Sequence, residues 1–324
     1  MEKFDVVIVG AGPAGLSVAK ILGEEGKGVL LLEKNSRIGP KICAGGLTQR
    51  SFQFRLPLNL ADRIFNSFKI NAFGKEMEIK GKRFLITTIN REKLGQWMLK
   101  EIKKNVQIRI NSEVIKIERD YVFLKDGQKI KFDFLIGADG SLSLVRKYLN
   151  LPTKKAWSTI QYTITQDFKD LEVFFEPALF GSGYAWIFPH NNFVSIGCVT
   201  DSEFQALNLF KNFHYWLKKM KIEINQAKLE SFPINFDYRG FKFGNIFLVG
   251  DAAGFASGLT GEGIYAAILS GREVAQKILN PNYNFPGIRK LLKKKFLEER
   301  IGKTLISPVL KSKKLTQIIF KRYL

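Results

Sequence analysis

The segment that most constrains this chain lies at its beginning, where an apolar, β-branched stretch at residues 4–9 runs directly into GAGPAG at residues 10–15. An apolar-periodic stretch follows, so the order is strand, glycine turn, helix. Gly10 permits the tight turn, Gly12 lets the backbone approach a pyrophosphate, and Gly15 lets the helix pack closely on the strand. The pyrophosphate would lie at the positive end of the helix. The segment therefore predicts a dinucleotide-binding α/β fold with a parallel sheet.

A second apolar run, residues 29–32, ends at Glu33, which follows Gly10 by 23 positions. This spacing fits a carboxylate that accepts hydrogen bonds from ribose hydroxyls. A carboxylate here also disfavours a 2′-phosphate, so NADP is not the nucleotide expected at this site. Pro13 suits the first turn of the helix. A fortuitous glycine turn would not combine all these features.

Two later segments each place an aspartate after a strand and a glycine. Residues 132–136 lead into Gly-Ala-Asp139-Gly, and residues 246–249 lead into Gly-Asp251. The first resembles the GADGxxSxVR segment of flavin hydroxylases, and it implies FAD rather than NAD. A carboxylate at a strand end can accept bonds from sugar-like hydroxyls, and a positive helix terminus stabilises the charge on a reduced flavin. Taken alone, either aspartate would be interpreted as a turn or cap residue.

Three further stretches carry a resemblance to a known family: KICAGGL at residues 41–47, YAWIFP at residues 184–189 and LTGEGI at residues 259–264. With them the chain resembles the geranylgeranyl reductase family of FAD-dependent oxidoreductases, from the N-terminus to about residue 280. The resemblance implies a hydroxylase-type flavoprotein fold. It also implies reduction of carbon–carbon double bonds in polyprenyl chains of pigment precursors, ether lipids or quinones.

The chain departs from the family pattern at three places. His190 stands where the family usually has Lys, Gly-Cys-Val at residues 197–199 replaces Gly-x-Gly, and the Arg-x-x-Phe-Asp helix begins here with Arg91-Glu-Lys-Leu-Gly. These departures leave the substrate open. An FAD-dependent aromatic monooxygenase or halogenase is one alternative, and a basic flavin-containing binding protein is an alternative from another class.

The resemblance also implies which residues bind the cofactor. They come from the glycine turn, the end of the second strand, the arginine helix, the two aspartate segments and the late glycine loop. The expected FAD contacts are Gly10, Gly12, Pro13, Ala14, Gly15, Glu33, Lys34, Gly45, Arg91, Val114, Asp139, Gly140, Gly250, Asp251, Gly261, Gly263 and Ile264.

The expected substrate site is the YAWIFP stretch, because Tyr184, Trp186 and Phe188 alternate with period two and would share one face of a strand. Without the resemblance, a core stripe is the commoner explanation. Pro189 and Gly46 complete the expected substrate contacts. The catalytic candidates are Cys43, Tyr184 and Trp186. Cys43 is either a thiol that contacts substrate or flavin, or a buried inert cysteine.

The charge of the chain is unusual, with a formal net charge of +21. Residues 287–324 hold twelve Lys or Arg against two Glu. Apolar residues are interleaved with these lysines at spacings of three and four. This pattern fits a basic amphipathic helix on an anionic membrane or a final helix packed on the core. No nucleic-acid partner is expected, because no binding motif accompanies the charge.

The remaining composition indicates the cellular compartment and argues against a metal site. Two cysteines indicate a reducing interior, two histidines argue against a His-based metal site, and no apolar stretch is long enough to span a bilayer. We therefore expect no metal and a cytoplasmic protein, or one peripheral on the inner face of the membrane. Because there is one dinucleotide fingerprint, electrons should come from NAD(P)H that binds transiently or from a ferredoxin-like protein.

The expected architecture is α+β overall, a discontinuous Rossmann-like FAD domain with an interleaved antiparallel-sheet substrate domain. The FAD domain is expected at residues 1–65, 89–150 and 240–285. The substrate domain is expected at residues 66–88 and 151–239, and a basic helical tail at residues 286–324.

Overall fold

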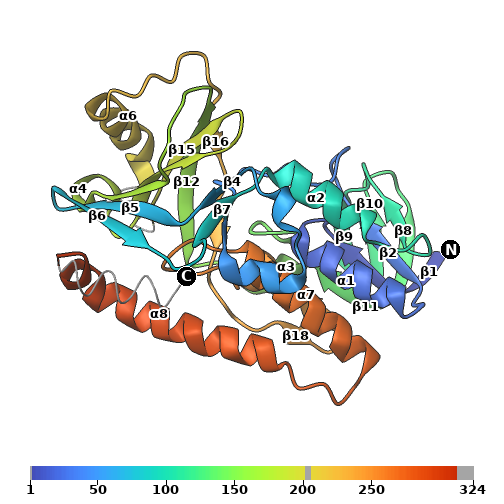
Figure 1. The fold of residues 1–324 in the computed structure, drawn as a ribbon. Coiled ribbons are helices and arrows are strands. Elements are labelled where there is room, and N and C mark those ends of the chain that lie inside the picture. The colour runs from blue at the N-terminus through green and yellow to red at the C-terminus, as the bar shows by residue number, and fades with distance from the viewer. Residues whose placement is uncertain (1, 201–205, 312–324) are drawn as a thin grey trace. The chain divides into compact units, whose positions relative to one another are not determined.

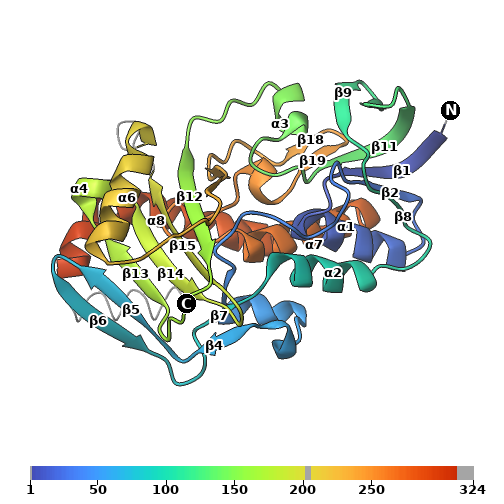
Figure 2. The same cartoon turned by 90° about the horizontal axis from the view of Figure 1, so that it is seen from above.

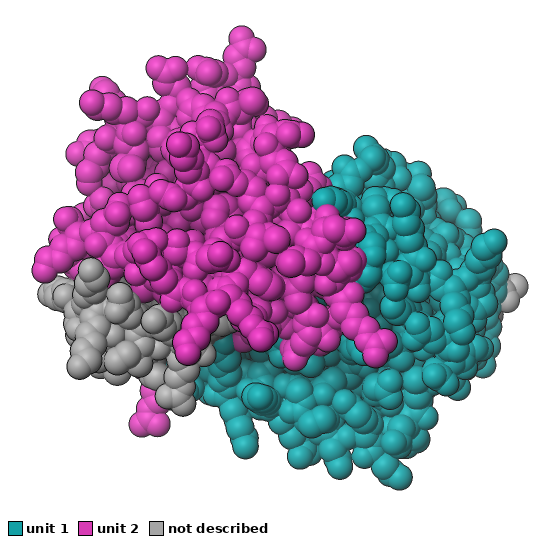
Figure 3. Space-filling model, in the orientation of Figure 1, with its two compact units in different colours: residues 1–41, 92–156, 234–297 teal, residues 42–91, 157–233, 298–324 magenta. Residues whose placement is uncertain are grey.

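The computed structural model describes residues 2–200 and 206–311, with side chains up to residue 300. The chain divides into two compact units, coloured separately in Figure 3. Unit 1 comprises Met1–Lys41, Glu92–Ala156 and Ile234–Leu297, and unit 2 comprises Ile42–Arg91, Trp157–Pro233 and the chain from Glu298 onward. Each unit is discontinuous in sequence, as expected for two interleaved parts.

Unit 1 is built on a largely parallel sheet with the order β18-β19-β11-β1-β2-β8 (Figures 1 and 2). β1 lies between β11 and β2 and is parallel to both, while β18 and a β9-β10 pair are antiparallel additions. This is the nucleotide-binding sheet predicted from the sequence. The strands are β1 (Glu2–Val9), β2 (Val29–Leu32), β8 (Gln107–Arg109), β9 (Val114–Glu118), β10 (Tyr121–Leu124), β11 (Lys129–Gly137), β18 (Lys242–Phe243) and β19 (Ile246–Leu248).

Helices cover this sheet, and Figure 2 shows α1, α2 and α7 on one side of it. α1 and α7 pack closely because Gly271 has no side chain: a Cβ there would come within 2.4 Å of the Ala14 carbonyl oxygen. The elements are α1 (Pro13–Glu24), α2 (Arg91–Lys100), α3 (Leu144–Tyr148), the short strand β17 (Ile234–Asn235), the 3-10 helix η3 (Gly250–Ala253), α7 (Ile264–Leu279) and α8 (Pro286–Lys311).

The C-terminal helix α8 begins by packing on unit 1. Ile288 is fully buried, and Leu291 and Leu292 pack against the same apolar cluster. The start of α8 is capped by Glu273, whose carboxylate accepts the backbone N–H groups of Gly287 at 2.6 Å and Ile288 at 2.7 Å. The sequence left two interpretations of the basic segment, a helix on an anionic membrane and a helix packed on the core. For the first part of this segment, the structure supports the helix packed on the core. Residues 312–324, which belong to the expected basic tail, lie outside the described residues.

Unit 2 contains a mostly antiparallel sheet with the order β16-β12-β15-β14-β13-β5-β6; along this order β13 and β5 are parallel and the other neighbouring strands are antiparallel. The antiparallel strands expected in residues 66–88 and 151–239 form it. The strands are β5 (Ser67–Ala72), β6 (Lys75–Lys80), β12 (Ala156–Ile164), β13 (Glu172–Phe175), β14 (Tyr184–Pro189), β15 (Val194–Thr200) and β16 (Glu230–Ser231).

Among the described residues, the helices α4 (Pro177–Phe180) and α6 (Leu209–Lys219) cover this sheet. α6 buries Phe213 and Trp216 against the apolar side chains of β12, β13 and β15, which fixes the orientation of the helix.

Residues 42–65 belong to a different unit from the one expected. The sequence put them with the flavin domain, whereas the structure groups them with unit 2, because a small three-stranded sheet, β3-β7-β4, ties them to residues 86–88. The elements are β3 (Gly46–Thr48), η1 (Gln49–Phe54), η2 (Leu58–Leu60), β4 (Arg63–Phe65) and β7 (Ile86–Thr88). No helix that the structure describes is long and apolar enough to cross a membrane.

Candidate functional site

The glycine turn of unit 1 is closed on one side and open on the other. Gly10 has a φ of +101°, and a Cβ there would come within 2.5 Å of the Ala138 carbonyl oxygen. A Cβ at Gly15 would lie 2.0 Å from the Gly10 carbonyl oxygen, so both positions require glycine. Gly12, at the start of α1, instead faces open space, with no atom within 4 Å of where its Cβ would be. The free N–H groups at the start of α1 can therefore bind a pyrophosphate.

Glu33 stands directly beside this turn, at the end of β2. Its Oε2 accepts the backbone N–H of Ala11 at 2.9 Å, and its Oε1 accepts both the backbone and side-chain N–H groups of Asn35, at 3.0 and 2.6 Å. The carboxylate is thus fixed at the glycine turn, where the sequence predicted it. Lys34 is exposed next to it.

Asp251 lies in η3, after β19, and its carboxylate is partly exposed. Its Oδ2 accepts hydrogen bonds from Lys41 Nζ at 3.0 Å and Ser141 Oγ at 3.4 Å. A Cβ at Gly263 would come within 3.0 Å of Oδ1, so the glycine permits the close approach of the loop. Lys41 was part of a family stretch but was absent from the predicted contacts. Its partner is 210 positions away, so no local pattern could have revealed the pair.

The Asp139 carboxylate is hydrogen-bonded to residues that follow it in the chain. Its Oδ1 accepts the Ser143 hydroxyl at 2.5 Å, and its Oδ2 accepts the backbone N–H groups of Leu144 at 2.7 Å and Val145 at 3.2 Å. Burial raises the pKa of this carboxyl, and these hydrogen bonds oppose the rise. The carboxylate therefore caps the start of α3, which is the alternative that the sequence left open. Gly140 beside it, with a φ of +76°, borders open space.

The loop between η3 and α7 is organised around Ser257. Its hydroxyl accepts the backbone N–H groups of Leu259 and Thr260, both at 3.2 Å, and its carbonyl accepts Gly261 N–H at 3.1 Å. α7 begins at Ile264, and no side chain caps it. The N–H groups of Leu259, Thr260 and Gly261 are thus bonded within the loop, and the positive end of α7 that follows is suited to the N1 and O2 region of a reduced flavin.

Three more expected cofactor contacts can be placed. Gly250, at the start of η3, has a φ of +57°. Arg91 is buried, and its Nε has no hydrogen-bond partner among the described residues. Arg91 is grouped with unit 2 and is the first residue of α2. Val114 begins β9, and its side chain lies in the core of unit 1, so only its backbone could contact a ligand.

The residues of unit 1 therefore fit FAD. Open space at Gly12 and Gly140 and uncapped helix termini are the features that a dinucleotide with a flavin ring requires. No group of three or more His, Cys, Asp or Glu in the described part of the chain could hold a metal ion.

In unit 2, the loop that carries Cys43 crosses the end of β14. A Cβ at Gly46 would come within 2.7 Å of the Phe188 ring, and a Cβ at Gly45 within 2.7 Å of the His190 ring. The partly exposed Cys43 accepts a hydrogen bond from Gly45 N–H at 3.4 Å. The structure thus brings together three predicted residues, Cys43, Gly46 and Phe188, within one unit.

His190 anchors the same loop. Its Nδ1 lies 2.8 Å from Asp62 Oδ2, its Nε2 lies 3.1 Å from the Ala44 carbonyl oxygen, and its ring stacks on Phe193. Both partners are hydrogen-bond acceptors, so both ring nitrogens are placed to donate. The sequence treated His190 as a departure with no assigned role. Its loop-holding role depends on residues that are distant in the chain.

The aromatic side chains of β14 share one face, as predicted. Tyr184 packs against Trp186 with ring centroids 6.3 Å apart, and Tyr184 and Phe188 both pack against one apolar cluster. The intervening Ala185 and Ile187 point into the other cluster, below α6. Trp186 is 5% exposed, and its Nε1 donates to Ser195 Oγ at 3.1 Å, so it is also a packed core residue.

Comparison with known proteins identifies the family to which the chain belongs. The model of the FAD binding domain family matches residues 3–282, and the chain belongs to this family. The protein is thus an FAD-dependent oxidoreductase.

Among similar proteins, the chain is 27% identical to a digeranylgeranylglycerophospholipid reductase of Methanococcus vannielii, over 87% of this chain and 80% of the relative. It is 28% identical to a geranylgeranyl diphosphate reductase of Rhodobacter capsulatus, over 85% and 74%. In structure it is similar to a geranylgeranyl bacteriochlorophyll reductase-like protein from Thermoplasma acidophilum, with a TM-score of 0.80 at 20% identity, covering 96% of this chain and 90% of the other. The last likeness supports the fold.

Proposed function

We propose that the protein is an FAD-dependent reductase that adds two hydrogens across carbon–carbon double bonds of a polyprenyl lipid. The observation that carries this proposal is the aromatic face of β14, with Tyr184, Trp186 and Phe188, beside the loop that carries Cys43. The names of the relatives support the substrate class. An oily chain needs a slot lined by apolar and aromatic groups, and this face would supply one.

The chemistry of the substrate explains why aromatic residues are useful. An isolated trisubstituted alkene is a poor hydride acceptor, so its reduction needs a proton and passes through a state with positive charge on carbon. Reduced FAD, when bound, supplies the hydride. The rings of Tyr184 and Trp186 would stabilise the positive charge through their faces. Burial raises the pKa of Tyr184, so its hydroxyl keeps its proton at neutral pH.

The electrons for FAD must come from outside the chain. The sequence has one dinucleotide fingerprint, and unit 1 uses it for the resident cofactor. We propose that the donor is NAD(P)H bound transiently or a ferredoxin-like protein. Anaerobic reduction of the bound flavin by each donor, followed by its absorbance, would distinguish the two.

The direct assay incubates dithionite-reduced enzyme with geranylgeranyl and quinone-type isoprenoids and measures product mass. We expect a gain of two hydrogens for each double bond reduced. Tyr184→Phe should slow the reaction without changing FAD binding, because the residue is assigned to the substrate. Tyr162→Phe is the matched control, since it removes the hydroxyl of another tyrosine of unit 2, which bonds His214.

A different result would support the alternative enzyme class. If no polyprenyl compound gains hydrogen, but the reduced enzyme consumes oxygen and hydroxylates an aromatic compound, the protein is a monooxygenase. A flavin that no donor can reduce would instead support a binding protein.

A further inference from the structure

The helix α6 has two different apolar faces. Its inner face, with Leu209, Phe213 and Trp216, is buried in the core of unit 2. Its outer face carries Phe210 and Tyr215 among lysines and His214. Phe210 and His214 are neighbours at a spacing of four, and Tyr215 lies about 140° around the helix from Phe210 with His214 between them, so the three side chains bound one outer arc of α6.

This outer surface is unusually exposed for its composition. Tyr215 is 62% exposed and Phe210 is 56% exposed, while Leu207, just before the helix, is 87% exposed. Leu207 and Tyr215 are the two most exposed large apolar side chains that the structure describes. A cluster of exposed large apolar side chains marks an interaction site more often than a neutral surface.

Phe210 is held in this outward position. Its ring lies over His214, with centroids 4.0 Å apart, and the Phe210 carbonyl oxygen is 2.8 Å from His214 Nδ1. His214 Nε2 is in turn 3.0 Å from the Tyr162 hydroxyl of β12. This arrangement corresponds to an imidazole that donates from Nδ1 and accepts at Nε2. The exposed ring is therefore braced from the sheet through the histidine.

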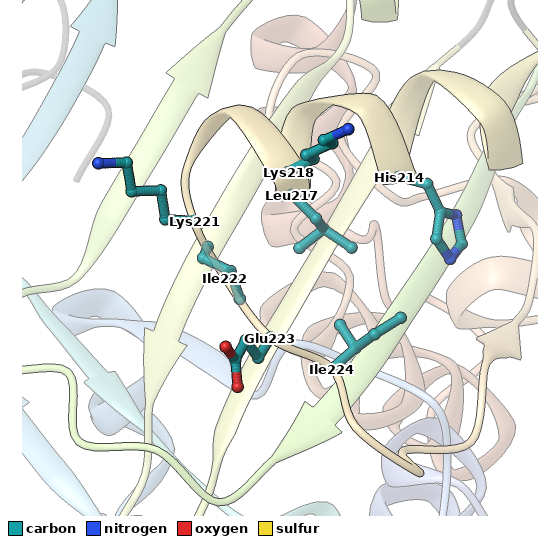
Figure 4. Close-up of a pocket in the computed structure, with 7 residues that line it drawn as sticks. All are labelled: His214, Leu217, Lys218, Lys221, Ile222, Glu223 and Ile224. Carbon is teal, nitrogen blue, oxygen red and sulfur yellow. The ribbon is translucent and has the colours of Figure 1, made fainter.

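A shallow pocket of about 330 Å³ continues this surface beyond the end of α6 (Figure 4). Apolar side chains of Leu217, Ile222 and Ile224 line it, Lys218 and Lys221 extend from its rim, and His214 and the Glu223 carboxylate complete its lining (Figure 4). The apolar lining and the two lysines continue the character of the outer face of α6, with one carboxylate among them.

The charge of the surface identifies its partner. α6, with the sequence LFKNFHYWLKK, contains three lysines and no carboxylate. Lys219 is paired with Glu176 at 2.8 Å, whereas Lys211 and Lys218 are exposed on the outer face. A twofold contact of α6 with α6 of a second copy would place lysines opposite lysines, which is unfavourable. An anionic lipid surface accepts lysines at its headgroups and aromatic rings at the edge of its acyl region.

We propose that the outer face of α6, defined by Leu207, Phe210, Lys211, Tyr215 and Lys218, binds the surface of anionic lipid bilayers. Phe210, Tyr215 and Leu207 enter the interface, and the lysine stems lie along it with their ammonium groups at the phosphates. This surface is separate from the basic C-terminal segment. The inference does not rest on the proposed reaction, because lipid binding can be measured without turnover.

The test is flotation of the full-length, FAD-loaded protein with vesicles of phosphatidylcholine alone or mixed with phosphatidylglycerol. We expect binding to the mixed vesicles only. Phe210→Ser with Tyr215→Ser should lower binding at least about tenfold, since two large apolar groups are lost from the interface. Lys211→Gln with Lys218→Gln should lower it about 30-fold at low salt.

Matched controls separate this surface from general effects. Ile115→Ser changes an apolar side chain that is 53% exposed in unit 1, and Lys100→Gln with Lys147→Gln removes two exposed lysines there. Both controls should bind like the unchanged protein. All variants should keep the same unfolding temperature, because the altered side chains are exposed.

Three results would overturn the proposal: no binding of the unchanged protein to mixed vesicles, equal binding by the α6 variants, or equal losses in the controls. Loss of self-association or of binding to an acidic protein, with vesicle binding intact, would also overturn it. The α6 variants should still reduce a short isoprenoid in detergent at the normal rate. If vesicle binding follows the expected pattern and no isoprenoid is reduced, only the proposed reaction fails.

Discussion

The Glu33 carboxylate accepts the backbone N–H of Ala11 at 2.9 Å, so the residue expected to bind a ribose also shapes the glycine turn that would hold the pyrophosphate. Glu33→Ala removes this acceptor and the one for Asn35. We expect FAD binding to weaken by about 1.5–3 kcal/mol, the usual effect of losing a charge-assisted hydrogen bond. Titration of the apoprotein with FAD, followed by flavin fluorescence, measures this change.

Glu33→Gln is the informative companion. Its amide oxygen can still accept the Ala11 N–H, so the turn should be kept while the charge is lost. FAD affinity of Glu33→Gln should lie between those of the unchanged protein and Glu33→Ala. Equal affinity in all three proteins would remove Glu33 from the cofactor site.

Asp251 gives a second prediction for the cofactor. Its carboxylate forms an ion pair with Lys41, whose side chain is 33% exposed. Asp251→Ala should weaken FAD binding by about 1.5–3 kcal/mol, because it removes a hydroxyl acceptor at the end of β19. Asp139→Ala should instead lower the thermal stability of unit 1, because that carboxylate caps α3. Calorimetry measures the stability of both variants, and FAD titration measures their affinity for the cofactor. Equal losses of FAD affinity in the two variants, with unchanged stability, would contradict the separate roles of Asp251 and Asp139.

The turn between β1 and α1 was predictable because its strand, glycine and helix signals lie together in residues 4–22, with known backbone requirements. The alternating pattern of unit 2 predicted an antiparallel sheet, but it did not predict which strands form the edges of that sheet. The pairing of β3 with β7 joins residues about 40 positions apart, which periodicity cannot reveal. The Lys41–Asp251 and His190–Asp62 pairs are likewise tertiary contacts. The cap formed by Asp139 was among the sequence alternatives because its partners, Ser143, Leu144 and Val145, follow it within six residues.

The packing of Trp186 on Gly197 leads to a third prediction. A Cβ at Gly197 would come within 2.3 Å of the Trp186 ring and 2.6 Å of the Ile160 carbonyl oxygen. Gly197→Ala should therefore destabilise the protein by about 1–3 kcal/mol through overpacking. The control is Gly28→Ala, where the new Cβ would make an ordinary contact at 3.4 Å. Urea unfolding of the two variants compares them.

Combining the change with a smaller ring tests the cause. Trp186→Phe removes the part of the ring that Gly197 accommodates, so Gly197→Ala should be less harmful in that background. The same Trp186→Phe variant should reduce isoprenoids more slowly while binding FAD normally, since Trp186 is assigned to the substrate. A Gly197→Ala effect that is the same with Trp or Phe at position 186 would show that the ring is not the obstacle.

The last prediction concerns alkaline pH and the turn between α7 and α8. Burial and the hydrogen bond that Tyr283 donates to Glu273, at 2.9 Å, raise the pKa of Tyr283 to about 12. Because the pKa is higher in the folded protein than the unfolded value of about 10, the contribution of Tyr283 to stability is complete below pH 10. It is then lost as the pH rises through 12. Tyr283→Phe should remove this part of the alkaline loss, which urea unfolding at a series of pH values would measure. If the free energy of unfolding of Tyr283→Phe depends on pH as in the unchanged protein, the hydrogen bond of the Tyr283 hydroxyl does not stabilise this turn.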